Sequence, residues 1–185
     1  VTKDFLNPLV LALEKNPGMA PKNILKVADA LEKECENIKK GKPVDENFFR
    51  FVIEFIRNYA DKFHHAKEEE ILFKQFCKNE SELHCNPVEQ MLYEHKEGRN
   101  FVRGIEIGLE KRNKNQIIQN ALGYVHLIRE HIFKEDNILY PLTEQVLSKE
   151  AQKDMLKKFE KIQKDREKEI KDYLTFVKKI GKDRK

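Results

Sequence analysis

Two segments of the sequence combine histidine and glutamate at a spacing that suits metal binding: HHAKEEEILFK and HIFKEDNILYP. The first contains His64 and Glu68, and the second contains His131 and Glu135. On an α-helix, residues four positions apart lie about 40° apart around the axis, so each pair offers one nitrogen and one oxygen donor from one face. A carboxylate can also bridge two ions, and mixed nitrogen and oxygen ligands suit iron, manganese or zinc.

The two segments share a longer pattern, His-x-x-Lys-Glu-acid-x-Ile-Leu-aromatic, at an interval of 67 residues. One His-x3-Glu pair would be weak evidence, because a glutamate four residues from a basic residue is common on helix surfaces. Two copies that both lead into Ile-Leu-aromatic indicate two equivalent helices that face each other across a core.

A helical wheel separates the polar residues of the first segment. At about 100° per residue, Ala60 and Ile71 lie near the direction of His64, and Glu68 lies at the edge of the same apolar arc. His65 points about 180° from the centre of that arc. We therefore expect His64 and Glu68 to face inward and three neighbours to lie at the surface: His65, Glu69 and Glu70.

The same construction for the second segment places apolar side chains around the direction of His131: Tyr124, Leu127, Ile128 and Ile138. Glu135 lies about 40° from His131, whereas His126 and Asp136 lie about 140° away. This wheel favours Glu135 over Asp136 as the inward carboxylate and predicts an outward His126.

His95 is a further candidate ligand, because apolar residues surround its direction at helical spacing: Val88, Met91, Leu92 and Val102. Gly98, one turn further on, leaves space beside it. A lone histidine on an apolar face is more often a hydrogen-bonded core residue than a ligand. The two His-x3-Glu helices in the same chain favour ligation here.

Helix start and stop signals predict the elements that position these residues. Asp45, Pro87 and Ser148 stand where helices begin, and 41–43 and 111–115 contain breaking residues. We predict an all-α fold with one domain over 1–185, an up-and-down four-helix bundle. Its parts are an N-terminal segment 1–20, the bundle 22–147 with its fourth helix ended or kinked at Pro141, and an additional C-terminal helix 149–180.

Composition limits the classes of partner. The net charge is +4, and residues 157–185 carry 12 Lys and Arg against 6 Asp and Glu. Those charges alternate in sign without an aromatic-rich basic patch, which is typical of a solvated helix, so we expect neither nucleic acid nor membrane as a partner. Segment 5–13 is too short for a membrane span and lacks the basic flank of a signal peptide.

The three cysteines show no CxxC pair, so a disulfide framework is not expected. A reducing compartment fits, and we expect a soluble, cytoplasmic protein. Cys77, His84 and Cys85 could hold zinc in the loop 77–85, but a fourth ligand and a regular spacing are missing, so this alternative is less favoured.

Together these motifs resemble the hemerythrin-like family with HHE cation-binding domains over roughly residues 20–160. Members are four-helix bundles with a non-heme di-iron centre, bridged by two carboxylates and an oxo or hydroxo group. They bind O2 or respond to O2, iron or nitric oxide. The resemblance implies five metal ligands: His64, Glu68, His95, His131 and Glu135.

The sequence departs from the family pattern at the start of the first helix. The family usually has a further histidine there, and alignment places it at about Pro21, but no histidine precedes His64. The expected centre therefore lacks one imidazole, which leaves water on one metal, a substitute ligand, or a single ion as alternatives. The spare imidazoles, His65 and His126, both point the wrong way on regular helices.

The favoured function is a di-iron protein that binds or senses O2 or another small diatomic ligand, with zinc or manganese as alternative metals. No general acid, substrate pocket or nucleophile is evident, so binding is favoured over turnover. The alternatives are action on nitric oxide or peroxide, or iron–sulfur repair, and thirdly a zinc-bound or metal-free interaction module. A protein partner is not predicted.

Overall fold

The computed structural model describes residues 21–78 and 87–183, and every element in these ranges is helical. The N-terminal segment 1–20, His84 and Cys85 lie outside the described residues. The helices are α2 (Pro21–Lys39), α3 (Glu46–Phe55), η2 (Ile56–His65), η3 (Glu68–Leu72), α4 (Phe73–Cys77), α5 (Val88–Glu110), α6 (Lys114–Lys134), η5 (Glu135–Leu139), α7 (Tyr140–Val146), α8 (Lys149–Asp165) and α9 (Glu167–Asp183). None of these helices is long and apolar enough to cross a membrane.

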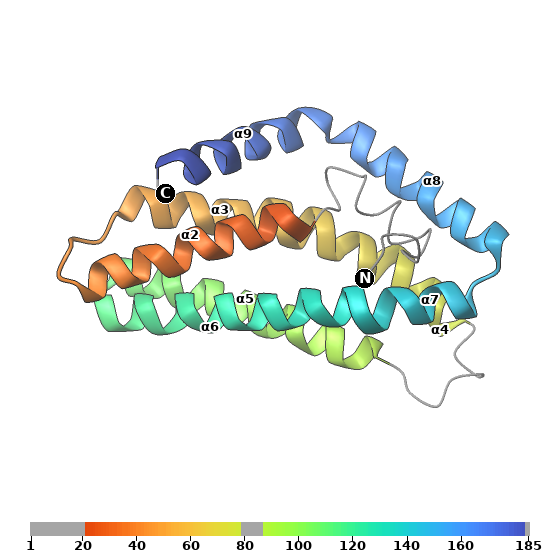
Figure 1. Ribbon diagram of the computed structural model, residues 1–185, viewed down its shortest axis with the longest axis horizontal. Coiled ribbons are helices and arrows are strands. Elements are labelled where there is room, and N and C mark those ends of the chain that lie inside the picture. Colours follow the sequence, from red (N-terminus) through yellow and green to blue (C-terminus); the bar gives the residue numbers. More distant parts are fainter. Residues whose placement is uncertain (1–20, 79–86, 184–185) are drawn as a thin grey trace, which may run out of the picture.

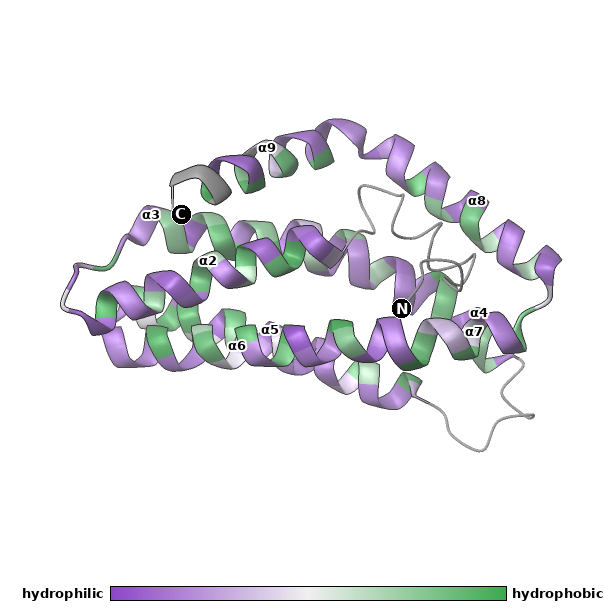
Figure 2. Cartoon of the chain, in the orientation of Figure 1, coloured by the Kyte–Doolittle hydropathy of each residue, from purple (hydrophilic) through white to green (hydrophobic). Residues whose placement is uncertain are grey.

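The helices form a bundle in which α5 packs along α6, and α6 packs against α2. Figure 1 shows these helices lying lengthwise beside the run from α3 to α4. Helices α8 and α9 follow the outside of the bundle, where α9 contacts α2 and α8 contacts η3. Both are mainly hydrophilic with a narrow hydrophobic stripe (Figure 2), and that stripe buries Met155, Phe159, Ile170, Val177 and Ile180.

Two predicted helix caps are confirmed. The Asp45 side chain accepts a hydrogen bond from the backbone N–H of Phe48 at 3.0 Å, and Ser148 accepts one from Ala151 at 3.2 Å. A cap of this kind satisfies an N–H group that has no partner within the helix. The helix starts could therefore be placed from sequence to within a residue or two.

Two predicted helix ends differ in the structure. The chain stays helical through Pro141 as far as Val146, so the fourth helix does not end at this proline. The C-terminal helix, predicted as continuous, is divided at Arg166, whose backbone leaves the helical conformation between α8 and α9.

Glycines allow α5 and α6 to approach closely. A Cβ on Gly108 would lie 2.8 Å from the Cγ1 atom of Ile117, and one on Gly123 would lie 2.4 Å from the Phe101 ring. Both distances are too short for a real Cβ atom. Glycine at these positions therefore sets the separation of the two helices that carry His95 and His131.

Three helical segments in the described residues have π geometry: η2, η3 and η5. In a π-helix each backbone hydrogen bond spans five residues instead of four, so fewer degrees separate successive side chains. Glu68 begins η3 and Glu135 begins η5, which are the equivalent positions of the two repeated segments. The sequence repeat is thus also a repeat of local backbone geometry.

The apolar core consists of two clusters, with polar residues between them. The larger cluster includes Phe63, Val102 and Ile132, and the smaller includes Leu72, Met91 and Leu139. The chain therefore passes from one cluster to the other three times: in the run from α3 to α4, in α5, and in the run from α6 to η5. The histidines and glutamates that could bind metal lie where these helices pass between the two clusters. The polar centre is therefore enclosed by apolar side chains on both sides.

Candidate metal centre

The structure brings all five residues of the predicted ligand set together in the interior. Their exposed fractions are 2% or less: His64, Glu68, His95, His131 and Glu135. They fall into two groups of potential donors, each with its ligand atoms within 4.8 Å of one another. The His64 group contains His64, Glu68 and Glu135, and the His65 group contains His65, Glu68, His95 and His131.

Glu68 belongs to both groups and lies between them. Its Oε2 atom is 4.0 Å from His64 Nε2 and 3.4 Å from His95 Nε2. The hydroxyl of Tyr140 donates a hydrogen bond to the other oxygen, Oε1, at 3.0 Å. The carboxylate is held by this hydroxyl and keeps an oxygen facing an imidazole of each group.

Glu135 lies near imidazoles of both groups as well. Its Oε1 atom is 2.8 Å from His131 Nε2 and 3.7 Å from His64 Nε2. Two carboxylates, Glu68 and Glu135, therefore stand between the two sets of imidazoles.

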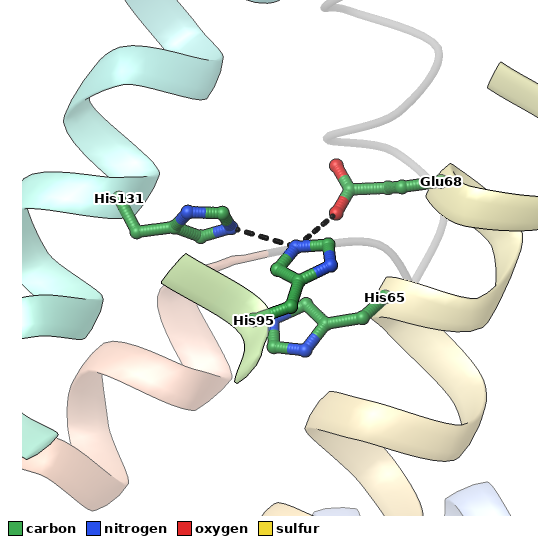
Figure 3. A group of neighbouring side chains, drawn as sticks. All are labelled: His65, Glu68, His95 and His131. Carbon is green, nitrogen blue, oxygen red and sulfur yellow. Dashed lines mark hydrogen bonds and ion pairs between the residues drawn. The ribbon is translucent and has the colours of Figure 1, made fainter. Parts of the chain in front are cut away.

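His65 corrects the sequence prediction, which placed it at the surface. It is only 6% exposed, and its ring stacks on that of His95 with the centroids 3.9 Å apart (Figure 3). The wheel assumed regular α-helical geometry, but η2 is a π-helix, so the direction of each side chain shifts along the segment. Both histidines of the pair face inward as a result.

This shift bears on the imidazole that was expected near Pro21. Pro21 begins α2 as a half-buried residue. With His65 turned inward, four imidazoles are buried around the centre: His64, His65, His95 and His131. The helical run from α3 to α4 thus supplies two of these imidazoles, His64 and His65. One sequence feature could have indicated this, because Asp61 precedes His65 by four residues and lies 3.5 Å from its Nδ1 atom.

Two further carboxylates lie behind the imidazoles of His95 and His131. His95 Nδ1 is 2.7 Å from Glu69 Oε1, and His131 Nδ1 is 2.9 Å from Glu94 Oε2. Because a carboxylate only accepts hydrogen bonds, each Nδ1 atom donates. Each Nε2 atom is then left as the inward-facing donor for a metal, which is the usual arrangement around metal-bound histidine.

The two Nε2 atoms face each other at 3.1 Å (Figure 3). With both Nδ1 atoms protonated, two neutral rings would bring their lone pairs together, which is unfavourable unless a positive charge lies between or beside them. A proton can supply this charge, and so can a metal ion bound by both rings. The arrangement therefore fits a cation at this position.

Several buried polar atoms of the centre have no hydrogen-bond partner in the described part of the chain: His64 Nδ1 and Nε2, His65 Nε2, Glu68 Oε2 and Glu135 Oε2. Buried polar atoms are normally hydrogen-bonded, and buried charges are paired or coordinate metals. These atoms come from imidazoles and carboxylates, which are good ligands for a transition metal. The residues present therefore fit a metal centre.

Burial and neighbouring charges shift the pKa values of the centre. Burial alone would lower the pKa of His131, but the nearby carboxylates, chiefly Glu135, raise it to about 10. Burial would raise the pKa of Glu135, but His131 and His64 hold it well below its usual range. Burial and the neighbouring His95 hold the pKa of His65 well below its usual range, which keeps this ring neutral and able to bind a metal.

The remaining wheel predictions have mixed outcomes. Glu70, His126 and Asp136 are exposed, as predicted. Glu69 was also expected at the surface, but its side chain is only 26% exposed because it binds both His95 and Arg99. Leu92 and Ile138, expected to surround His95 and His131, are 41% and 42% exposed.

Replacing Glu94 with glutamine is expected to weaken metal binding about tenfold. Burial would raise the pKa of Glu94, but hydrogen bonds from His131 and Lys134 lower it to about 2, so it is an anionic acceptor for the His131 ring. The amide would bind the ring less well and would no longer fix its orientation. Chelator competition measures the affinity, with Glu97→Gln, one turn away on α5, as the control; equal affinities for both variants would contradict the role given to Glu94.

The helices thus enclose a buried cluster of imidazoles and carboxylates, which is a donor set that could hold a metal ion. A family model, the hemerythrin HHE cation-binding domain, matches residues 20–143. The chain therefore belongs to the hemerythrin HHE cation-binding family. No curated protein and no solved structure matches the chain.

Proposed function

We propose that this protein is a non-heme di-iron protein that binds or senses O2. The observation that carries the proposal is Glu68, a fully buried carboxylate shared by two groups of nitrogen and oxygen donors. A carboxylate in this position suits a bridge between two ions. Glu135, which lies near both His64 and His131, suits a second bridge.

The donor types favour iron over zinc. Both groups consist only of imidazoles and carboxylates, which suit iron, whereas structural zinc sites usually contain thiolates in a closed tetrahedron. When bound, a pair of ferrous ions would supply the electrons and the open coordination position that O2 binding needs. Manganese uses similar ligands, so metal analysis is part of the test below.

The protein's own residues would hold and protect the ions. His64 and His65 are adjacent residues of η2 and fall into different groups, so this helix would contribute a ligand to each of the two ions. The two apolar clusters on either side would limit access of water. The proposal includes the up-and-down order of the four helical runs, which places the two repeated segments on opposite sides of the centre.

Binding or sensing is proposed in preference to turnover, because the groups nearest the centre that could transfer protons are already engaged. The Tyr140 hydroxyl donates to Glu68, Glu94 accepts from His131, and Glu69 pairs with His95 and Arg99. We also place the protein in a reducing cytoplasm. The buried Cys35 is a free thiol, which supports this location.

Exposure of the ferrous protein to O2 tests the function. Protein loaded with Fe(II) under anaerobic conditions is expected to gain a near-ultraviolet and visible absorption band on exposure to O2 and to lose it when O2 is removed. Zinc-loaded protein is the control and should show no such band. Failure to retain iron while zinc binds tightly would contradict the proposal, and steady consumption of nitric oxide or peroxide with a reductant would favour an enzyme.

A further inference from the structure

A cavity of about 320 Å³ lies directly beside the candidate metal centre, between η2, α5 and α6. We call it the Tyr124 cavity, and its inner wall includes His65, His95 and Tyr124. We propose that the Tyr124 cavity binds a small carboxylic acid with an apolar body and a second oxygen atom at the end opposite the carboxylate. The inference goes beyond O2 binding and does not depend on it, because every group it uses belongs to the chain.

The size of the cavity indicates an organic molecule. One water molecule takes up about 30 Å³ in the liquid, so the space corresponds to about ten non-hydrogen atoms. A diatomic gas would leave most of it empty. Pockets for organic ligands begin at roughly 300 Å³. The cavity thus matches a molecule of the size of a substituted benzoate.

The inner wall offers one unused hydrogen-bond donor. The Tyr124 side chain is 2% exposed, and its hydroxyl has no hydrogen-bond partner in the described residues. A buried hydroxyl without a partner is costly, and a ligand oxygen would satisfy it. Because Tyr124 lines the cavity, this oxygen belongs at the inner end of the ligand.

Apolar side chains form the middle of the wall. Ile56 and Val102 are buried and line the cavity together with Gly98. A Cβ added at Gly98 would lie 3.5 Å from Leu127 and 3.8 Å from Tyr124, which are ordinary contacts. The helix packing around Gly98 therefore does not require glycine, in contrast to Gly108 and Gly123. The absent side chain keeps the cavity wide.

The outer rim carries three arginines and two acids. Arg57 forms a bidentate pair with Glu106, and Arg99 pairs with Asp61. Arg103 is exposed, and none of the ion pairs found among residues 21–78 and 87–183 includes it. Its charge acts only at longer range on Glu106, whose pKa is lowered chiefly by Arg57 and to a smaller extent by Arg103. This cation favours an anionic group at the outer end of the ligand, where a carboxylate and a guanidinium match in geometry.

Three probes separate the two polar contacts: 4-hydroxybenzoate, benzoate and phenol. Isothermal titration calorimetry on the purified protein is expected to show saturable 1:1 binding of 4-hydroxybenzoate. Benzoate lacks the inner oxygen and should bind about fivefold more weakly, a typical effect of one hydrogen bond. Phenol lacks the carboxylate and should bind about threefold more weakly than 4-hydroxybenzoate, because the contact with Arg103 is exposed to solvent.

Variants assign each difference to its residue. Tyr124→Phe should abolish the preference for 4-hydroxybenzoate over benzoate, and Arg103→Gln should abolish the preference for 4-hydroxybenzoate over phenol. Lys111→Gln, which removes an exposed charge just past the end of α5, should change neither. Val102→Phe, which fills the cavity, should weaken all three probes about tenfold. Gly98→Ala should act in the same direction and is the milder variant, since its methyl group fits without displacement.

Three results would overturn the proposal. The first is the absence of saturable binding by all three probes. The second is binding that neither Gly98→Ala nor Val102→Phe weakens, which would place the ligand elsewhere. The third is binding that disappears when a chelator removes the metal and is unaffected by Tyr124→Phe and Arg103→Gln, because the carboxylate would then coordinate the metal directly. Circular dichroism of each variant verifies the fold.

Discussion

Glu68→Ala is expected to remove most of the bound metal from both halves of the centre. Glu68 is the residue that the His64 group and the His65 group share, and it is fully buried. Loss of a direct ligand should cost more than the roughly tenfold to 100-fold in affinity that supporting residues provide. Mass spectrometry of the metal bound per chain is the measurement, after loading the wild type and the variant with Fe(II) under the same conditions.

The matched control is Glu70→Ala, two residues along the same helix, where the side chain is 68% exposed. This variant should keep its full metal content. Equal metal contents in Glu68→Ala and the wild type would show that Glu68 is not a ligand. Two further variants test the division into groups, because His64→Ala and His65→Ala should each lose about one ion of the two. Full metal content in His65→Ala would show that His65 packs in the core but does not bind the metal.

Lys67→Met is expected to raise the free energy of unfolding by about 2 kcal/mol, the typical gain when a poorly compensated buried charge is replaced by an apolar side chain. Lys67 is 1% exposed, and its Nζ atom has no hydrogen-bond partner in the described residues. Burial, and to a smaller extent Arg166, lower the pKa of this lysine to about 7. One contact favours the charge, since Nζ lies 3.5 Å from the centroid of the Phe63 ring.

Urea denaturation of the metal-free proteins at pH 7 measures this effect. The control is Lys62→Met on the same helical run, which is exposed and should change stability by about 0.5 kcal/mol or less. A loss of stability in Lys67→Met would contradict the expectation. It would mean that the contact with Phe63 outweighs the cost of burying the ammonium group.

The helix starts and the inward direction of the proposed ligands could be predicted from the sequence because they depend on local rules. Asp45 and Ser148 have side chains that cap helices, and the structure confirms both. The inward direction of His64 and Glu68 followed from their place beside an apolar arc. These features depend on the residue types within a few positions of each other, which is the range over which sequence patterns are informative.

His65 could not be placed correctly, because its direction depends on a π-helix. The wheel used the regular helical angle, and nothing in the pattern of η2 marks the wider hydrogen bonds. The only indication in the sequence is Asp61, four residues before His65, whose carboxylate lies 3.5 Å from the His65 ring in the structure. Ile138 was misplaced for the same reason. It was expected to face inward beside His131, but it lies in the π-helix η5 and is exposed.

The carboxylates behind the histidines were also missed, since they join distant parts of the chain. Glu69 meets His95 across 26 residues, and Glu94 meets His131 across 37. Such contacts depend on the relative position of two helices, which the glycines of α5 and α6 help to set. A single sequence contains the glycines but not the contacts that they permit.

The most direct test is the location of iron in crystals of the Fe(II)-loaded protein, by anomalous diffraction on both sides of the iron absorption edge. We predict two anomalous peaks in the interior, one bound by His64, the other by His95 and His131, with the Glu68 carboxylate between them. A single peak, or peaks that do not contact Glu68, would contradict the shared centre on which the proposed function depends.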